Sequence, residues 1–143
     1  MICDAPFDNI YKFNKMKQTI SFLAILILFF AGEPPAHYTC FLDRKIDSTT
    51  HAWNKVSIPV IFDYPDSKVI IFSETTLTLK ITSLGKHFYN KDGNNQVEMG
   101  AVDQEGRKCV VSFIISPDHV EDRKERLLVR WGSVVAEYCL RKE

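Results

Sequence analysis

Four histidines are the first side chains to consider for chemistry in this 143-residue chain: His37, His51, His87 and His119. No two of them stand at the spacing that places two ligands of one metal ion on a single helix or strand. His119 lies in an acidic stretch, SPDHVEDRK, where either a bound cation or a solvated connection would account for the residues. Because no ligand pattern is present, the sequence predicts no metal site and no cofactor.

Recognised catalytic motifs are also missing from the sequence. It contains no G-x-S-x-G, no H-E-x-x-H, no P-loop and no G-x-G-x-x-G. The acidic pairs, such as Asp63 with Asp66, flank predicted turns, where carboxylates usually have structural roles. We therefore expect no enzyme activity. The alternative is a small secreted hydrolase or an enzyme inhibitor, and the hydrolase would need an acid and a hydroxyl within hydrogen-bonding reach of His87 or His119.

The cysteines leave two alternatives open. Cys3 precedes the predicted signal segment, so an odd number remains downstream: Cys40, Cys109 and Cys139. Cys109 and Cys139 both lie on strongly predicted strands and are a candidate disulfide. The strand pattern places them on opposite faces, however, so the alternative is that they are small buried thiols. The absence of C-x-x-C gives no support to a redox site or a zinc knuckle.

Aromatic side chains are spread along all the predicted strands. Most of them are expected in the core, because aromatic residues dominate burial in a small β domain. In a small barrel a few would also line a mouth that accepts an apolar ligand. The candidate ligand-binding residues are Phe62, Phe113, Trp131 and Tyr138.

The segment Ile20–Ala31, ISFLAILILFFA, is the only long unbroken apolar run. It is shorter than the roughly 20 residues that span a bilayer, and Lys17 gives it the positive flank of a signal peptide. We therefore predict export, to the periplasm, the medium or the cell envelope, with Met16 as the start of the signal frame. No candidate cleavage site has a small residue at its −3 position. Two tethered forms therefore stay open, through residues 20–31 or through a lipid on Cys40.

The chain divides into a signal region (1–36), a linker (37–52) and a β domain (53–143). In the β domain, apolar residues alternate from Val56 to Phe62 with the period of two of a strand. Pro59 lacks an amide donor, so we expect this strand at an edge or with a bulge. Residues 77–82 and 86–90 are predicted as separate strands, with a bend at Leu84–Gly85 between them.

About seven or eight short strands follow one another, with turn signals between them and no segment of helical period. The alternation of apolar and polar residues predicts which side chains point inward. They are those of the odd-numbered residues in 109–115 and 127–131 and of the even-numbered residues in 134–140. Short connections favour neighbouring strands that pair in sequence order. The predicted fold is thus all-β, a single antiparallel meander closed as a small lipocalin-like barrel or folded as a sandwich, behind an apolar signal or anchor helix.

The formal charges balance, with eighteen basic and eighteen acidic side chains. A neutral chain without a basic cluster does not present the electrostatic footprint of a nucleic-acid-binding protein. The expected partner is an unidentified protein or a small apolar ligand, and contact with a membrane is expected only through an uncleaved N-terminal segment.

Between Trp53 and Lys142 the chain contains, in this order, the sequence blocks IPVIFD, KVIIFS, LTLKI, DQEGRKCVV, LLVRW and YCLRK. This succession resembles a family of small exported proteins of the Bacteroidetes that pair a signal segment with one β domain. The most recognisable blocks, 103–109 and 138–141, are hairpin and core features. The resemblance therefore implies an exported β domain and passes on no activity, since the family has no assigned function. The expected function is a non-catalytic module that binds a ligand or a partner at the cell envelope.

Overall fold

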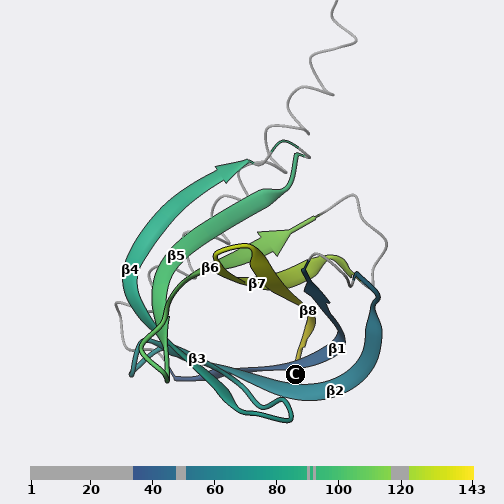
Figure 1. Ribbon diagram of the computed structural model, residues 1–143, viewed down its shortest axis with the longest axis horizontal. Coiled ribbons are helices and arrows are strands. Elements are labelled where there is room, and N and C mark those ends of the chain that lie inside the picture. Colours follow the sequence, from purple (N-terminus) through teal and green to yellow (C-terminus); the bar gives the residue numbers. More distant parts are fainter. Residues whose placement is uncertain (1–33, 48–50, 90, 92, 117–122) are drawn as a thin grey trace, which may run out of the picture.

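Eight β-strands form a closed antiparallel barrel in which each strand pairs with its neighbours in sequence and β1 pairs with β8 (Figure 1). The computed structural model describes residues 34–47, 51–89, 91, 93–116 and 123–143. The strands are β1 (Ala36–Ile46), β2 (Asn54–Asp63), β3 (Lys68–Ile71), β4 (Leu77–Tyr89), β5 (Asn95–Asp103), β6 (Lys108–Ile115), β7 (Glu125–Trp131) and β8 (Val134–Lys142). The all-β meander is confirmed, and it closes as a barrel. The predicted signal segment lies outside the described residues.

The core fills the inside of the barrel, because alternate residues of each strand point inward. The predicted phases are confirmed on β6 and β7, where Val111, Phe113, Leu127 and Val129 all belong to the core. On β8, Tyr138 and Leu140 belong to it as well. Periodicity alone was sufficient for these strands because their inward positions are apolar over most of their length.

The predicted linker is wrong for residues 37–46, which lie in β1. Tyr38 and Cys40 point inward, but the pairing of β1 with both neighbours shifts between Cys40 and Leu42. Beyond this bulge Asp43 pairs with inward-facing Tyr138, so the inward phase moves from even to odd residues. A bulge adds one residue to a strand and reverses which face the following side chains occupy. The alternation that marks a strand is therefore lost from the sequence here.

Residues 77–89 form the single strand β4, where the sequence predicted two strands and a bend. The pairing of β4 with β5 shifts twice, between Ile81 and Ser83 and between Leu84 and His87. Gly85 lies in the second shift, and a Cβ at this position would collide with the backbone carbonyl of Glu98. The bend signal therefore marks a bulge within a continuous strand, and Figure 1 shows β4 and β5 curving together along their length.

Pro59 lies where β2 runs beyond the end of β3. β3 pairs with β2 only from Val60 to Asp63, and the amide of Phe72 donates to the carbonyl of Pro59 at 3.0 Å. In antiparallel pairing the amide and carbonyl of one residue point to the same neighbour. The edge alternative is wrong, because β2 pairs with β1 on one side and with β3 on the other. The bulge alternative agrees with the structure, since the pairing of β2 with β1 shifts between Ile58 and Lys55.

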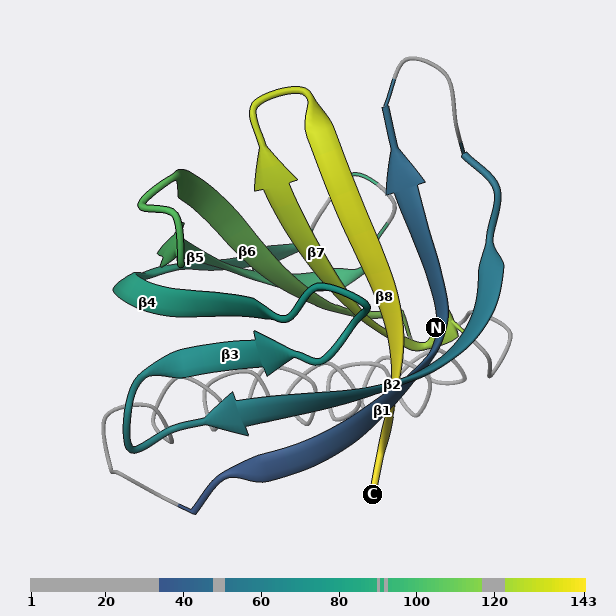
Figure 2. The same cartoon turned by 60° about the horizontal axis from the view of Figure 1, so that its bottom comes forward.

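The two ends of the barrel differ in their connections. The terminal end carries the start of β1, the end of β8, the turn 64–67 and the β4–β5 and β6–β7 connections. The opposite end carries the β1–β2 connection, residues 72–76, the turn 104–107 and the hairpin 132–133. Figure 2 shows β1 and β8 side by side where the barrel closes.

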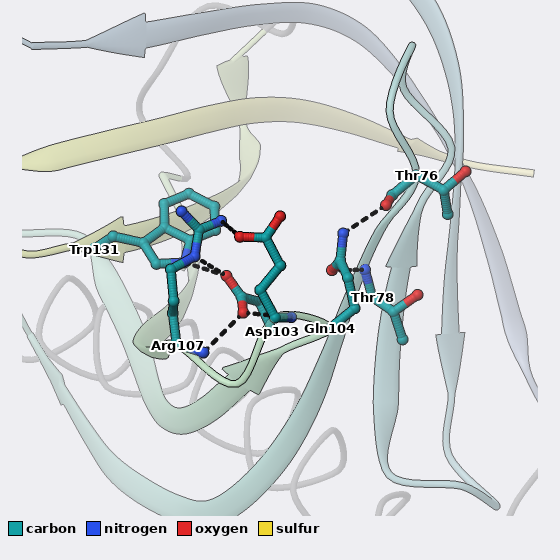
Figure 3. A network of polar contacts seen from close by, with 7 residues as sticks. Thr76, Thr78, Asp103, Gln104, Arg107 and Trp131 are labelled. Atoms are coloured by element: carbon teal, nitrogen blue, oxygen red, sulfur yellow. Dashed lines mark hydrogen bonds and ion pairs between the residues drawn. The ribbon is translucent and has the colours of Figure 1, made fainter.

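A buried carboxylate organises the opposite end. Asp103, the last residue of β5, accepts hydrogen bonds from the amides of Glu105 and Arg107, both at 2.9 Å. It also accepts from Arg107 Nε at 2.8 Å and from the indole Nε1 of Trp131 at 3.1 Å. Figure 3 shows these donors converging on Asp103. The carboxylate therefore fixes the turn between β5 and β6 and ties it to the end of β7.

Gln104 extends the same network to the next hairpin (Figure 3). Its amide nitrogen donates to the carbonyl of Thr76 at 2.9 Å, and its side-chain oxygen accepts from the amide of Thr78 at 3.0 Å. The segment that leads into β4 is thus held by the β5–β6 turn. The side chains of Asp103 and Gln104 thus join the turn 104–107, the end of β7 and the segment that leads into β4.

We expect the substitution Asp103→Asn to destabilise the barrel and to remove part of its pH dependence. Burial pushes the pKa of Asp103 up, but hydrogen bonds from Arg107 and Glu105 outweigh it and the net pKa is lowered. A lowered pKa in the folded state means that the unfolded chain binds the proton first. The stabilisation is therefore complete above the ordinary pKa near 3.8 and is lost as pH falls through the lower folded value.

The measurement is the free energy of unfolding by urea between pH 2.5 and 7, for wild type, Asp103→Asn and the exposed control Asp66→Asn, at roughly half-unit steps. Wild type and the control should lose stability steeply in the acid range, and Asp103→Asn should lose less. Equal slopes in all three proteins would contradict the assignment.

Candidate functional site

Phe62 and Phe113, two of the four predicted ligand-binding residues, meet inside the barrel. Their ring centroids are 5.8 Å apart in an edge-to-face arrangement, and they are 1% and 2% exposed. The ring centroid of Phe62 also lies 4.9 Å from that of Tyr38 and 6.3 Å from that of Tyr64. Edge-to-face contacts of this kind stabilise an aromatic cluster beyond its simple burial. The cluster lies just inside the terminal end, since Phe62 is followed by the last residue of β2 and then by Tyr64.

The other two predicted residues are not part of this cluster. Tyr138 faces inward from β8 beside Asp43 and Cys40, and burial with these two groups raises the pKa of its hydroxyl to about 12. Trp131 ends β7 at the opposite end, where its indole donates to Asp103. The structure therefore brings together only Phe62 and Phe113 of the predicted set.

Polar side chains surround the aromatic cluster at the terminal end. Strand register decides which residues point inward, because paired residues share a face of the wall. His87 pairs with the core residue Val97, and Asn95 pairs with Ile115, which packs against the core. Glu125 lies in phase with the core residue Leu127. Among the described residues, the polar side chains on the inward face at this end include Tyr38, Tyr64, His87, Asn95 and Glu125, together with Tyr89 and Lys142, which pair with Asn95 and Tyr38.

Glu125 is the acidic group of this set. Burial raises its pKa, while the positive charges of Lys124 and Lys142 act in the opposite direction. Its own charge, in turn, contributes to raising the pKa of Tyr38, after burial and the neighbouring Tyr64. No hydrogen bond or ion pair joins the Glu125 carboxyl to another residue of the described ranges. Glu125 is thus a half-buried carboxyl that can accept or donate a hydrogen bond to a bound molecule.

The histidines are distributed over separate parts of the barrel. His37 is exposed on β1, His51 is exposed before β2, and His119 lies outside the described residues. His87 Nε2 lies 3.2 Å from the Oδ1 of Asn95. A hydrolase would need an acid and a hydroxyl at the imidazole.

Sequence reasoning missed Glu125 and Tyr38 as members of this end. The signal for Glu125 was its phase, because it stands two residues before Leu127 on a strand whose odd residues point inward. Tyr38 was hidden because the bulge in β1 removed the alternation that would have revealed a strand. A charged residue in phase with core residues, at the first position of a strand, is the feature that could have located this site.

The structure does not bring Cys109 and Cys139 together, and neither forms a disulfide in it. Cys139 lies opposite Arg126, which lies opposite Ile114, five residues along β6 from Cys109. At about 3.3 Å per residue this separates them by roughly 16 Å. Disulfides join Cα atoms no more than about 7 Å apart. Cys109 also points into the core, whereas Cys139, beside Tyr138, points outward.

The cysteine thiols are expected to be unreactive in the folded protein. Burial, followed by the charges of Asp43 and Cys139, raises the pKa of Cys40 to about 12, and burial raises the pKa of Cys109 as well. At pH 8 a thiol with a pKa near 12 is ionised to about one part in ten thousand, and only the thiolate reacts.

Treatment of the native chain with iodoacetamide, followed by peptide mass spectrometry, should therefore leave Cys40, Cys109 and Cys139 unmodified. All three should react after unfolding in urea. Rapid labelling of Cys40 in the native state, or a recovered Cys109–Cys139 peptide pair, would contradict this account.

In the described ranges, no group of three or more His, Cys, Asp or Glu side chains could hold a metal ion. The same residues include no helix long and apolar enough to cross a membrane. Comparison of the chain with protein-family models, with curated proteins and with solved structures finds no match.

Proposed function

We propose that this protein is an exported, non-catalytic binding module of the cell envelope that takes a small amphipathic ligand at the terminal end of its barrel. The apolar part of the ligand would displace neighbouring side chains to reach the cluster of Phe62, Phe113 and Tyr38, because these rings are 1%, 2% and 7% exposed without it. Its polar part would meet Glu125 and His87. Ligand sites commonly combine an aromatic lining with a few polar groups that fix orientation.

The observation that supports the proposal is the contrast between two acidic side chains, Asp103 and Glu125. Asp103 at the opposite end receives four hydrogen bonds, so its carboxylate is fully used within the fold. Glu125 at the terminal end is half-buried with a raised pKa and has no such partners in the described ranges. A partly buried polar group costs free energy unless something pairs with it. A ligand with a hydrogen-bonding head would supply that pairing.

The envelope location in this proposal rests on the apolar segment 20–31 and its positive flank. Of the two tethered forms, we favour residues 20–31. Cys40 is 0% exposed within β1, and a lipid on its thiol would have to lie inside the barrel core. Removal of the chain before Cys40 would also delete residues of β1 that pair with β2.

The proposal is tested by fluorescence titration of the full chain with N-phenyl-1-naphthylamine, a neutral aromatic amine whose emission rises in apolar sites. We expect saturable binding to wild type and binding weakened about threefold or more in Phe62→Leu, which removes ring contacts and keeps an apolar side chain. The matched control is Phe72→Leu, because Phe72 is 42% exposed at the opposite end.

Circular dichroism of each variant establishes that the barrel is folded before the titrations are compared. Absence of saturable binding to wild type would overturn the proposal. Equal weakening in Phe62→Leu and Phe72→Leu would overturn it as well, since the probe would then bind away from the terminal end. Esterase activity that depends on His87 would favour the hydrolase alternative.

A further inference from the structure

A second charged cluster lies on the outer face of the barrel wall. Glu137 of β8 points outward, opposite Arg44 of β1 and Leu128 of β7, yet its side chain is only 2% exposed. Arg44 Nε donates to one of its carboxylate oxygens at 2.7 Å, and Arg126 Nη1 donates to the other at 2.9 Å. The single carboxylate is therefore shared by two guanidinium groups, each bound through one nitrogen.

Arg126 reaches further along the wall. Its Nη2 donates to the hydroxyl of Ser116 at 3.1 Å. Its Nε is buried and has no hydrogen-bond partner. Arg126 thus uses two of its nitrogens within the fold and leaves a third, buried donor unsatisfied.

Trp53, which precedes β2, joins a third arginine to the same cluster. The guanidinium carbon of Arg44 lies 4.2 Å from the centroid of the Trp53 ring, and that of Arg123 lies 5.1 Å from it. Cation–π contacts of this kind hold a guanidinium in place without neutralising its charge. The Nε of Arg123 is also buried without a hydrogen-bond partner, and Arg123 makes no ion pair with a described residue.

The charge of this cluster is not balanced. Arg44, Arg123 and Arg126 contribute three positive charges and Glu137 one negative charge, which leaves a net charge of +2 (3 − 1) among the described members. Buried donors without partners are rare in native proteins and indicate a missing water or ion. A water molecule would satisfy a donor but would leave the charge uncompensated. An anion satisfies both.

We propose that this outer-wall cluster, Arg44, Trp53, Arg123, Arg126 and Glu137, binds an oxyanion of the phosphate type. The guanidinium fork matches the spacing of two phosphate oxygens, and such charge-assisted hydrogen bonds are stronger than neutral ones. Arg123 and Arg126 supply the unsatisfied donors. Glu137 and Trp53 position the arginines, because each contacts two of them.

The site is separate from the one proposed at the terminal end. Glu137, Arg44 and Arg126 lie on the outer face of the wall, whereas Phe62, Phe113 and Glu125 point into the barrel. The phosphate could be free or could belong to a lipid headgroup. The two sources present the same group to the arginines, so the experiment has to distinguish them.

The test is isothermal titration calorimetry of the full chain with sodium phosphate at constant ionic strength. Wild type should bind phosphate saturably. Arg123→Gln should weaken the affinity about tenfold or more, because it removes a charge-assisted contact. This variant leaves both ion pairs of Glu137 intact, so the fold should be retained. The matched control is Arg130→Gln, an exposed outward-facing arginine on the same strand as Arg126, which should change the affinity less than about twofold.

Cosedimentation with vesicles separates the two sources. Vesicles of phosphatidylcholine alone and vesicles with phosphatidylglycerol are compared, so that binding through the apolar segment 20–31 contributes to both. Loss of the phosphatidylglycerol preference in Arg123→Gln would assign the site to lipid headgroups. Phosphate binding without such a preference would assign it to a free oxyanion. Either result supports the proposal.

Three outcomes would overturn it. The first is the absence of saturable phosphate binding to wild type. The second is an equal affinity in wild type and Arg123→Gln. The third is phosphate binding that appears only in the double variant Glu121→Gln/Asp122→Asn, since the acids that directly precede Arg123 in the sequence would then already neutralise the cluster.

Discussion

Closure of the barrel through β1 is the constraint on which the rest of the structure depends. β1 must pair with β2 on one side and with β8 on the other, and both registers shift at the same place, between Cys40 and Leu42. A barrel requires its strands to tilt and stagger, and a bulge lets one strand serve two neighbours. The bulge also decides where the charges go: Asp43 turns inward beside Tyr138, and Arg44 turns outward to meet Glu137.

The two ends of the barrel use acidic residues in different ways. At the opposite end, Asp103 is surrounded by donors from its own turn and from β7, and together with Gln104 it fixes three connections. At the terminal end, Glu125 lies beside aromatic rings and lysine charges, with a raised pKa. The Asp103 carboxylate is fully hydrogen-bonded within the fold, whereas the Glu125 carboxyl has no hydrogen bond or ion pair to another described residue.

The sequence allowed most of the architecture to be predicted. β6, β7 and β8 follow the period of two closely because their inward residues, from Val111 to Leu140, are apolar. The prediction failed where bulges occur, at Cys40–Leu42 and around Gly85, because an extra residue breaks the alternation. Periodicity identifies which face a residue occupies, but not how strands curve or how long a bulged strand continues.

The candidate sites were less predictable than the fold. Phe62 and Phe113 were found because aromatic residues in phase point to the same interior. Glu125 and the arginines of the outer wall were not, since each acquires its role from residues distant in the chain. Arg44 and Glu137 are 93 positions apart and meet only when β1 and β8 pair. Charge composition could not reveal this cluster, because the whole chain is neutral.

The central claim is that a ligand binds inside the terminal end of the barrel. The most direct measurement is nuclear magnetic resonance of the isotopically labelled full chain with bound N-phenyl-1-naphthylamine, in which contacts between probe and protein protons are observed. The account predicts contacts to the rings of Tyr38, Phe62 and Phe113, with shifts at the Glu125 amide. Contacts confined to Trp131 and its neighbours, or to the outer wall, would contradict it.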